Sequence, residues 1–248
     1  MKKLIDWMTN VVGPKASKFA SNPWVSAIQE TMVATMPVML ISSIITMISI
    51  INEYVPNFPD FSFFSTYTMG LSSIMVAILL PTFVLEKFRL PKYKRQAGFM
   101  GVAALFALSQ AFIDDNYNFA INADRVNASG IFVAIVAGLF VAVVMKAFSK
   151  RSLFKKDTQM PKFLTDSFDS MAPIVVIMTV LFVLCGLLKL DVYNIIQTMI
   201  DPLINIAQSC FGMTLVMFLM AFFYSFGLSP WLLTPVYYTV GMDAITKN

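Results

Sequence analysis

The sequence predicts an all-α, polytopic membrane protein with about six transmembrane helices and two amphipathic helices at the membrane interface. Three observations lead to this fold class. Of the 248 residues, 58% are hydrophobic and 13% are charged, and the mean hydropathy of +0.73 lies outside the soluble globular range. Several apolar runs approach the roughly 20 residues that a helix needs to cross a bilayer. These runs lack the period-two alternation of barrel strands, so helices are the expected form.

The predicted spans are apolar runs separated by polar or charged connections. They are Val33–Ile51, Met69–Leu85, Gly98–Ile113, Gly130–Phe148, Ala172–Leu188 and Phe211–Leu228. The first helix is expected to start before the lipid, because Asn22 is a good N-cap and Pro23 suits the first helical position. The third run is short, so its helix is expected to include flanking residues in order to span the membrane.

Two further segments have the pattern of amphipathic helices. Apolar residues between Leu4 and Val12 recur at helical spacing beside Lys2 and Lys3, which predicts a helix lying on the cytoplasmic leaflet. The segment Val192–Ser209 alternates an apolar and a polar face with the same period. Because it separates five spans from the sixth, we predict two domains, residues 1–190 and 191–248.

Basic residues alternate between connections and therefore predict the orientation. The N-terminal segment, the second connection and the fourth connection hold Lys2, Lys3, Lys15, Lys18, Lys87, Arg89, Lys92, Lys94, Arg95, Lys146, Lys150, Arg151, Lys155, Lys156 and Lys162. The intervening connections hold Arg125 and Lys189 among many acidic residues. Basic loops stay in the cytoplasm, so both termini are expected there. The same basic loops could also bind anionic lipid or a cytoplasmic partner, although topology alone explains them.

The residues that most enzymes use are missing or scattered. The chain has no histidine, and Cys185 and Cys210 fit neither a metal motif nor a disulfide framework. Nucleotide-binding loops are absent, and the span interiors hold no charged residue that could carry protons. We therefore expect no catalytic residue, metal, cofactor or nucleic-acid partner, and an energy source outside this chain if it moves a solute.

Small polar residues in the spans leave two interpretations open. They could form hydrogen bonds between helices, or they could line a substrate path. The residues concerned are Ser42, Ser43, Thr46, Ser72, Ser73 and Thr179.

Three stretches resemble one family of transporters. Ala27–Ile44 (AIQETMVATMPVMLISSI) resembles the first helix of the membrane component IIC of lactose/cellobiose-type phosphotransferase sugar permeases, although Ser42-Ser43 replaces the usual Gly-Ser pair. Gly130–Leu139 (GIFVAIVAGL) is similar to the family's fourth span, and Met160–Val176 (MPKFLTDSFDSMAPIVV) to the start of its fifth. The order and spacing of the three also match, and the resemblance covers essentially the whole chain.

The resemblance implies a bacterial cell-membrane protein that forms a homodimer through its first five spans. It further implies that a second amphipathic helix leads into a sugar-binding transport domain. Separate cytoplasmic IIB and IIA subunits would phosphorylate the sugar, so this chain would not be the enzyme. We expect a homodimer, or a dimer with a full-length relative, in which Gly130, Ala134 and Gly138 let helices approach closely.

The C-terminal segment is where the chain departs from the family pattern. The family has Phe-Gly-x-His-Gly after the sixth span, and this chain reads Phe226-Gly227-Leu228-Ser229-Pro230. Irregular backbone at membrane depth is tolerated where protein or a wet cavity satisfies it. The candidate sugar-contacting residues, offering an aromatic face, hydroxyls and exposed backbone, are Tyr224, Ser225, Gly227, Ser229 and Trp231. The competing interpretation is a helix end with an interfacial aromatic belt.

The predicted function is a disaccharide permease component that is incomplete by itself, because the family's later acidic sugar-binding segment is missing. A second polypeptide would then supply the missing part. The alternative is a non-transporting membrane protein that dimerises with or regulates a full-length permease. A small autonomous transporter or channel formed by oligomerisation is the third possibility.

Overall fold

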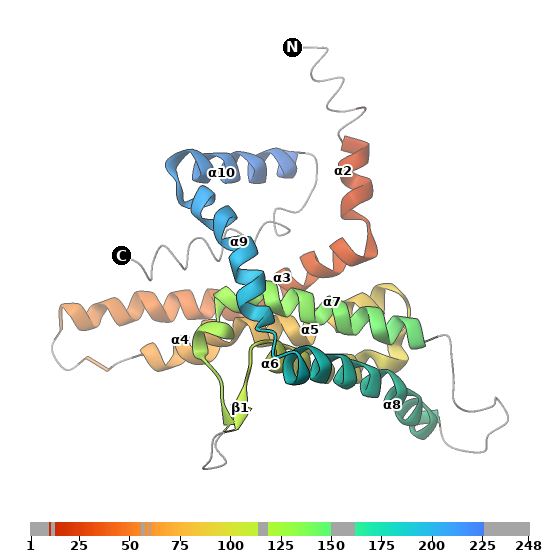
Figure 1. The fold of residues 1–248 in the computed structure, drawn as a ribbon. Coiled ribbons are helices and arrows are strands. Elements are labelled where there is room, and N and C mark those ends of the chain that lie inside the picture. Colours follow the sequence, from red (N-terminus) through yellow and green to blue (C-terminus); the bar gives the residue numbers. More distant parts are fainter. Residues whose placement is uncertain are drawn as a thin grey trace.

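The computed structural model describes residues 10, 13–55, 58, 59, 61–113, 119–149 and 162–225 (Figure 1). The described elements are α2 (Gly13–Ala20), α3 (Pro23–Ser49), η2 (Ile50–Glu53), α4 (Ser62–Thr68), η3 (Met69–Leu71), α5 (Ser72–Lys87), η4 (Pro91–Tyr93), α6 (Lys94–Leu108), β1 (Phe112–Ile113), β2 (Phe119–Ala120), η5 (Ala123–Arg125), η6 (Ala128–Gly130), α7 (Ile131–Phe148), α8 (Lys162–Leu181), the π-helix Phe182–Leu187, α9 (Val192–Gln208) and α10 (Cys210–Ser225). The all-α membrane architecture is confirmed. The predicted N-terminal amphipathic helix lies largely outside the described residues.

Four described helical segments are long and apolar enough to cross a membrane, and they are Pro23–Asn52, Phe63–Lys87, Ala128–Phe148 and Ser167–Leu187. The first begins as expected, with the Asn22 side chain accepting a hydrogen bond from the Trp24 backbone N–H. Helix α10 is a shorter apolar helix of 16 residues. Each of these five segments overlaps one predicted span.

The third predicted span differs most from the structure. Helix α6 has 15 residues and ends at Leu108, five residues before the predicted end at Ile113. Ile113 instead lies in β1, which pairs antiparallel with β2 in a two-stranded hairpin that the sequence analysis missed. The helix ends where Gln110 adopts a left-handed conformation (φ 54°) and the Ala111 N–H bonds to the Phe106 carbonyl.

The main core lies among α5, α6, α7 and α8. Its largest fully buried side chains include Leu85, Leu105, Ile131, Met145 and Ile177. Helices α5 and α6 approach so closely that a Cβ built at Gly101 would lie 1.9 Å from the Ala77 carbonyl oxygen. Only glycine fits at this position, and the missing side chain lets the backbones of two apolar helices pack against each other.

The small residues of α7 have a different role from the predicted one. A Cβ on Gly138 would lie 3.1–3.2 Å from Pro81 and Leu80 of α5, and one on Gly130 would lie 2.1 Å from the Arg125 carbonyl oxygen. Ala134 is fully buried. These residues thus pack α7 within one chain, and the prediction that they form a subunit contact was wrong, because spacing cannot tell which partner a small-residue stripe faces.

Five of the six small polar residues form hydrogen bonds, and the sixth, Ser72, has a buried hydroxyl with no hydrogen-bond partner among the described residues. Ser42 and Thr46 of α3 both bond to Ser65 Oγ of α4, at 3.2 and 3.0 Å. The Ser73 hydroxyl donates to the Asn127 carbonyl, and Ser43 and Thr179 donate to carbonyls of their own helices. These bonds agree with the structural interpretation of these side chains.

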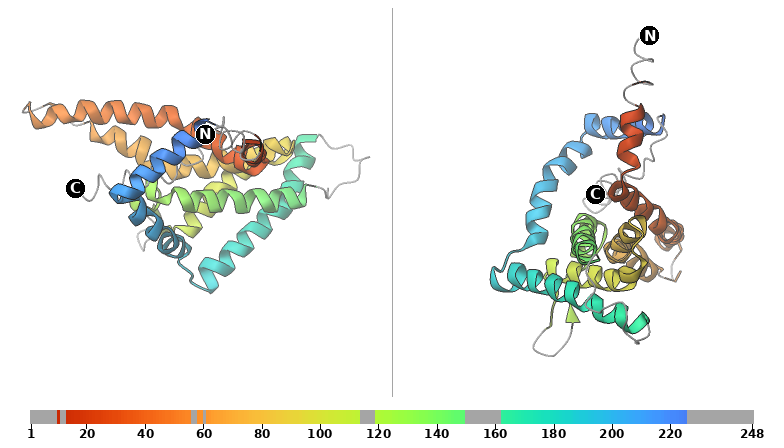
Figure 2. Two further views of the ribbon diagram at one scale, coloured as in Figure 1. Left: turned by 90° about the horizontal axis from the view of Figure 1, so that it is seen from above. Right: turned by 90° about the vertical axis from the view of Figure 1, so that its right-hand side faces the viewer.

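Helices α9 and α10 form an arm that leaves the packed helices. Figure 2 shows α9 rising from the end of α8 and carrying α10 away from α5, α6 and α7. Helix α9 agrees within one residue with the predicted segment Val192–Ser209. At its end the chain turns sharply, and a Cβ on Gly212 would lie 1.8 Å from the Ile206 carbonyl oxygen. We call residues 13–188 the scaffold and residues 191–225 the arm.

Candidate functional site

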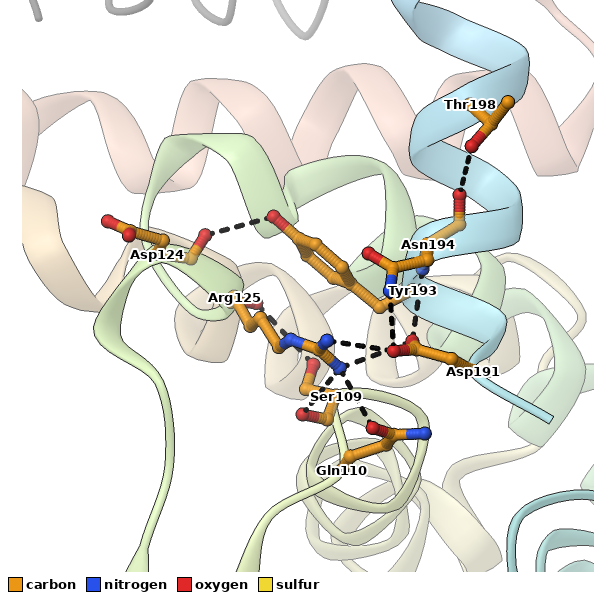
Figure 3. A network of polar contacts seen from close by, with 8 residues as sticks. All are labelled: Ser109, Gln110, Asp124, Arg125, Asp191, Tyr193, Asn194 and Thr198. Carbon is orange, nitrogen blue, oxygen red and sulfur yellow. Dashed lines mark hydrogen bonds and ion pairs between the residues drawn. The ribbon is translucent and has the colours of Figure 1, made fainter. Parts of the chain in front are cut away.

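A network of polar side chains joins the arm to the scaffold at the first turn of α9 (Figure 3). Its central residue is Arg125, which lies in η5, the single-turn helix that precedes α7. The network also includes the C-terminal end of α6 and the residues that begin α9. We call this group of eight residues the arm clamp; its members are Ser109, Gln110, Asp124, Arg125, Asp191, Tyr193, Asn194 and Thr198.

Arg125 and Asp191 form a two-point ion pair at the centre of the clamp. The distances are 3.2 Å from Nη1 to Oδ1 and 2.8 Å from Nη2 to Oδ2. Both side chains are largely covered, with exposed fractions of 18% and 24%. A planar guanidinium matches a carboxylate at two points, so the pair fixes orientation as well as position.

Arg125 also bonds to the end of α6. Its Nη1 lies 3.4 Å from the Ser109 carbonyl oxygen and 3.4 Å from Gln110 Oε1. The guanidinium therefore connects two elements that are far apart in sequence, the end of α6 and the start of α9.

Asp191 serves α9 as its N-cap. Its carboxylate accepts hydrogen bonds from the Asn194 backbone N–H at 3.1 Å and from Asn194 Nδ2 at 2.7 Å. A carboxylate here also offsets the positive end of the helix dipole. The residue that starts α9 is thus the same residue that binds the scaffold.

Tyr193 makes the second attachment of α9. Its hydroxyl donates to the Asp124 carbonyl oxygen at 3.1 Å, and the Arg125 guanidinium lies 4.8 Å from its ring centroid. Burial raises the pKa of the Tyr193 hydroxyl above its ordinary value, while the Arg125 charge acts in the opposite direction. The hydroxyl therefore stays protonated and able to donate throughout the neutral range.

A surface pocket of about 550 Å³ adjoins the clamp. It is lined by Ala107, Gln110, Ala111, Phe112, Cys185, Gly186 and Lys189. Gln110 and Lys189 both have left-handed backbone conformations, with φ of 54° and 48°. The lining side chains offer the Gln110 amide, the Lys189 ammonium and the weakly polar Cys185 thiol among apolar groups, which is fewer polar contacts than the many hydroxyls of a sugar require.

Two of the five predicted sugar-contacting residues lie in the described part of the chain, and neither belongs to the arm clamp or the adjoining pocket. Tyr224 and Ser225 lie at the end of α10, where Tyr224 is 73% exposed and the Ser225 hydroxyl donates to the Ala221 carbonyl. Gly227, Ser229 and Trp231 lie outside the described residues. In the part of the chain that the structure describes, no group of three or more metal-ligating side chains comes together.

The clamp was not predicted from the sequence, although two signals in the sequence point to it. Arg125 is one of two basic residues in connections that are otherwise acidic, so several nearby carboxylates could form an ion pair with it. Asp191 directly precedes the amphipathic segment, at the position where an N-cap is expected. Neither signal identifies the partner, since 66 residues separate the two in sequence.

The four long apolar helices define this chain as an integral membrane protein. Residues 29–248 match the protein family described as "Phosphotransferase system, EIIC". The chain therefore belongs to the EIIC family, whose members are the membrane translocation components of phosphotransferase systems.

Relatives of known activity cover most of this chain. It is 24% identical over 246 residues to the lactose-specific EIICB component of Staphylococcus epidermidis, and 24% identical over 248 residues to that of Staphylococcus haemolyticus. Each match covers 92% of this chain and 41% of the relative. The chain thus spans less than half the length of these relatives.

A solved structure has the same fold. The crystal structure of the transporter ChbC, the IIC component from the N,N'-diacetylchitobiose-specific phosphotransferase system, matches with a TM-score of 0.76 at 18% identity. The match covers 93% of this chain and 59% of ChbC. At this identity the likeness shows the fold alone.

Proposed function

We propose that this chain supplies the scaffold and the arm of a IIC component that carries a disaccharide, of the lactose or cellobiose kind, into a bacterial cell. The observation that carries the proposal is the match of residues 29–248 to the EIIC family. It is supported by the names of the relatives, whose sugars, lactose and N,N'-diacetylchitobiose, are both disaccharides. Cytoplasmic IIB and IIA subunits would perform the phosphoryl transfer.

Residues 1–190 would be the interface domain, and residues 191–248 would begin the transport domain. The arm clamp supports this division, because it attaches α9 to the scaffold at Asp191, next to the proposed boundary. We further propose that residues 1–248 do not transport sugar by themselves. Tyr224 and Ser225, offered as sugar contacts, lie at the exposed end of α10, and the pocket beside the clamp is poorly equipped for a sugar.

The test is uptake of labelled lactose and cellobiose by bacteria that lack related permeases but keep the soluble phosphotransferase proteins. Residues 1–248 alone should give background uptake. Co-expression with the transport-domain part of a full-length IIC component should restore it. Robust uptake by residues 1–248 alone would contradict the proposal. Background uptake even with the added part, when both polypeptides reach the membrane, would favour the non-transporting alternative.

We also propose a dimer, either of two copies or with a full-length relative. With Gly130, Ala134 and Gly138 buried inside the chain, the contact must use other residues. Helix α3 offers one surface, since it exposes Leu40, Ile41, Ile44 and Met47 by 53–70%. Mass measurement in detergent should give twice the protomer mass, and replacing exposed α3 residues such as Met47 by Lys should give a single protomer. A single protomer for the unmodified chain at every concentration would oppose the dimer.

A further inference from the structure

The lysines at the end of the scaffold where α3 starts and α5 and α7 finish have different kinds of partner. Lys87 pairs with Glu30 at 2.6 Å, and Lys94 pairs with Glu86 at 2.7 Å. Lys146, in the last turn of α7, pairs with no carboxylate of the described residues. Its ammonium instead lies 3.3 Å from the centroid of the Phe88 ring and 5.2 Å from that of Trp24.

The two aromatic rings cannot accept all the N–H donors of the Lys146 ammonium. An ammonium has three N–H donors, and two ring faces can receive at most two of them. The Trp24 indole N–H is a further donor, and it bonds to no oxygen of the described residues. The side chains of Lys146 and Trp24 thus present N–H donors without oxygen acceptors. The Trp24 ring is held beside the Phe88 ring in a tilted contact, with the ring centroids 5.3 Å apart.

The position of this cluster points to the kind of ligand. Trp24, Phe88 and Lys146 lie within two residues of the ends of three apolar spans, at Pro23, Lys87 and Phe148. The ends of spans lie at the level of lipid headgroups, where tryptophan and lysine are typical anchors. Below this level α3 exposes the aliphatic side chain of Val33, which an acyl chain can cover.

We propose that Lys146 and Trp24 form a binding site for the phosphate of an anionic phospholipid at the corner of α3, α5 and α7. The phosphate oxygens accept from the Lys146 ammonium and the Trp24 indole N–H, while the Phe88 ring holds the ammonium in place. The pairs Glu30–Lys87 and Glu86–Lys94 have no net charge, so the Lys146 ammonium adds an uncompensated positive charge to this corner. The positive charge favours phosphatidylglycerol over the zwitterionic phosphatidylcholine.

The experiment counts lipids bound to the purified 248-residue chain by native mass spectrometry in detergent. Dioleoylphosphatidylglycerol and dioleoylphosphatidylcholine are titrated separately, and inorganic phosphate at millimolar concentration is added as a competitor. The unmodified chain should retain phosphatidylglycerol selectively, and inorganic phosphate should not displace it. Equal retention of both lipids would overturn the proposal. Displacement by inorganic phosphate would also overturn it and indicate a site for free phosphate.

Variants then assign the binding to these residues. Lys146→Gln should weaken phosphatidylglycerol binding by about five-fold, the effect expected for one basic residue at a charged surface. Lys146→Arg should keep the affinity, because the charge and donors remain. Lys94→Gln removes the same charge from a paired lysine at the same end and should leave binding unchanged. Equal losses in Lys146→Gln and Lys94→Gln would mean that net charge, and not this site, retains the lipid.

A second variant covers the case in which Lys146→Gln does not fold. Trp24→Phe keeps an aromatic face for the ammonium but removes the indole N–H, so it should weaken phosphatidylglycerol retention as well. Unchanged retention in Trp24→Phe would remove the indole from the proposed site. Lipid retention and sugar uptake are separate measurements, so either proposal can fail while the other stands.

Discussion

At the scale of single residues, the structure shows where side chains stand in unusual backbone conformations. Arg89, Gln110 and Lys189 have φ between 48° and 56°, and each lies just after the end of a helix. A non-glycine residue in the left-handed region costs about 1–2 kcal/mol relative to the right-handed one. Gln110 and Lys189 border the pocket beside the arm clamp, whereas Arg89 lies at the opposite end of the scaffold, in the predicted cytoplasmic connection.

We predict that Arg89→Gly stabilises the protein. The Arg89 N–H bonds to the Glu86 carbonyl and the Leu90 N–H to the Leu85 carbonyl, so glycine would keep this helix end while removing the strain. The expected gain in the free energy of unfolding is about 1 kcal/mol. Thermal unfolding in detergent measures it, with Arg89→Ala as the control that should show no gain. An equal gain in both variants would show that the arginine side chain, and not its backbone conformation, is unfavourable.

At the scale of elements, hydropathy and cap signals predicted where most helices lie. Asn22, Pro23 and the apolar run that follows mark the start of α3, and the alternating faces of Val192–Ser209 mark α9. The hairpin β1–β2 was missed because its strands have only two residues each, and because β1 lies at the end of an apolar run whose pattern predicts a helix while β2 lies in the polar connection after it. The arm clamp was missed because its pairing depends on the tertiary arrangement of α6, η5 and α9, which no local pattern encodes.

The close packing of α5 on α6 gives a prediction at this scale. Gly101→Ala would place a methyl group 1.9 Å from the Ala77 carbonyl oxygen, so the two helices would have to move apart. We expect a loss of about 3 kcal/mol in the free energy of unfolding, the upper part of the range for overpacked cores. Gly70→Ala is the matched control, since the nearest atom to its new methyl group would be 3.8 Å away. Similar unfolding temperatures for the two variants would contradict the close approach of α5 and α6.

At the scale of the whole molecule, the charge distribution predicts how the protein lies in the membrane. Arg95 is near the start of α6 and Ala123 follows its end, so the two positions lie on opposite sides if α6 crosses the bilayer. Basic loops stay in the cytoplasm, which puts Arg95 inside and Ala123 outside. In a background without Cys185 and Cys210, a membrane-impermeant maleimide should label Ala123→Cys in intact cells and Arg95→Cys after lysis alone. The reverse pattern would overturn the orientation.

The arm clamp holds the start of α9 to the scaffold. The first turns of α9 also pack on the main core through Val192, Tyr193 and Ile196, while α10 packs against α9. Removing the Arg125 guanidinium would break the ion pair with Asp191 and the bonds to Ser109 and Gln110 together. Hydrogen bonds to a charged group contribute about 1.5–3 kcal/mol, enough to release the first turn of α9.

The most direct test is the distance between spin labels on the arm and on the scaffold. Labels at Met199 of α9 and Val143 of α7 suit this purpose, since these side chains are 73% and 51% exposed. The unmodified chain should give one narrow distance distribution by pulsed electron paramagnetic resonance. Arg125→Ala should broaden it, and Arg89→Ala, which removes an arginine outside the clamp, should not. A distribution that stays equally narrow in Arg125→Ala would contradict the claim that the clamp positions the arm.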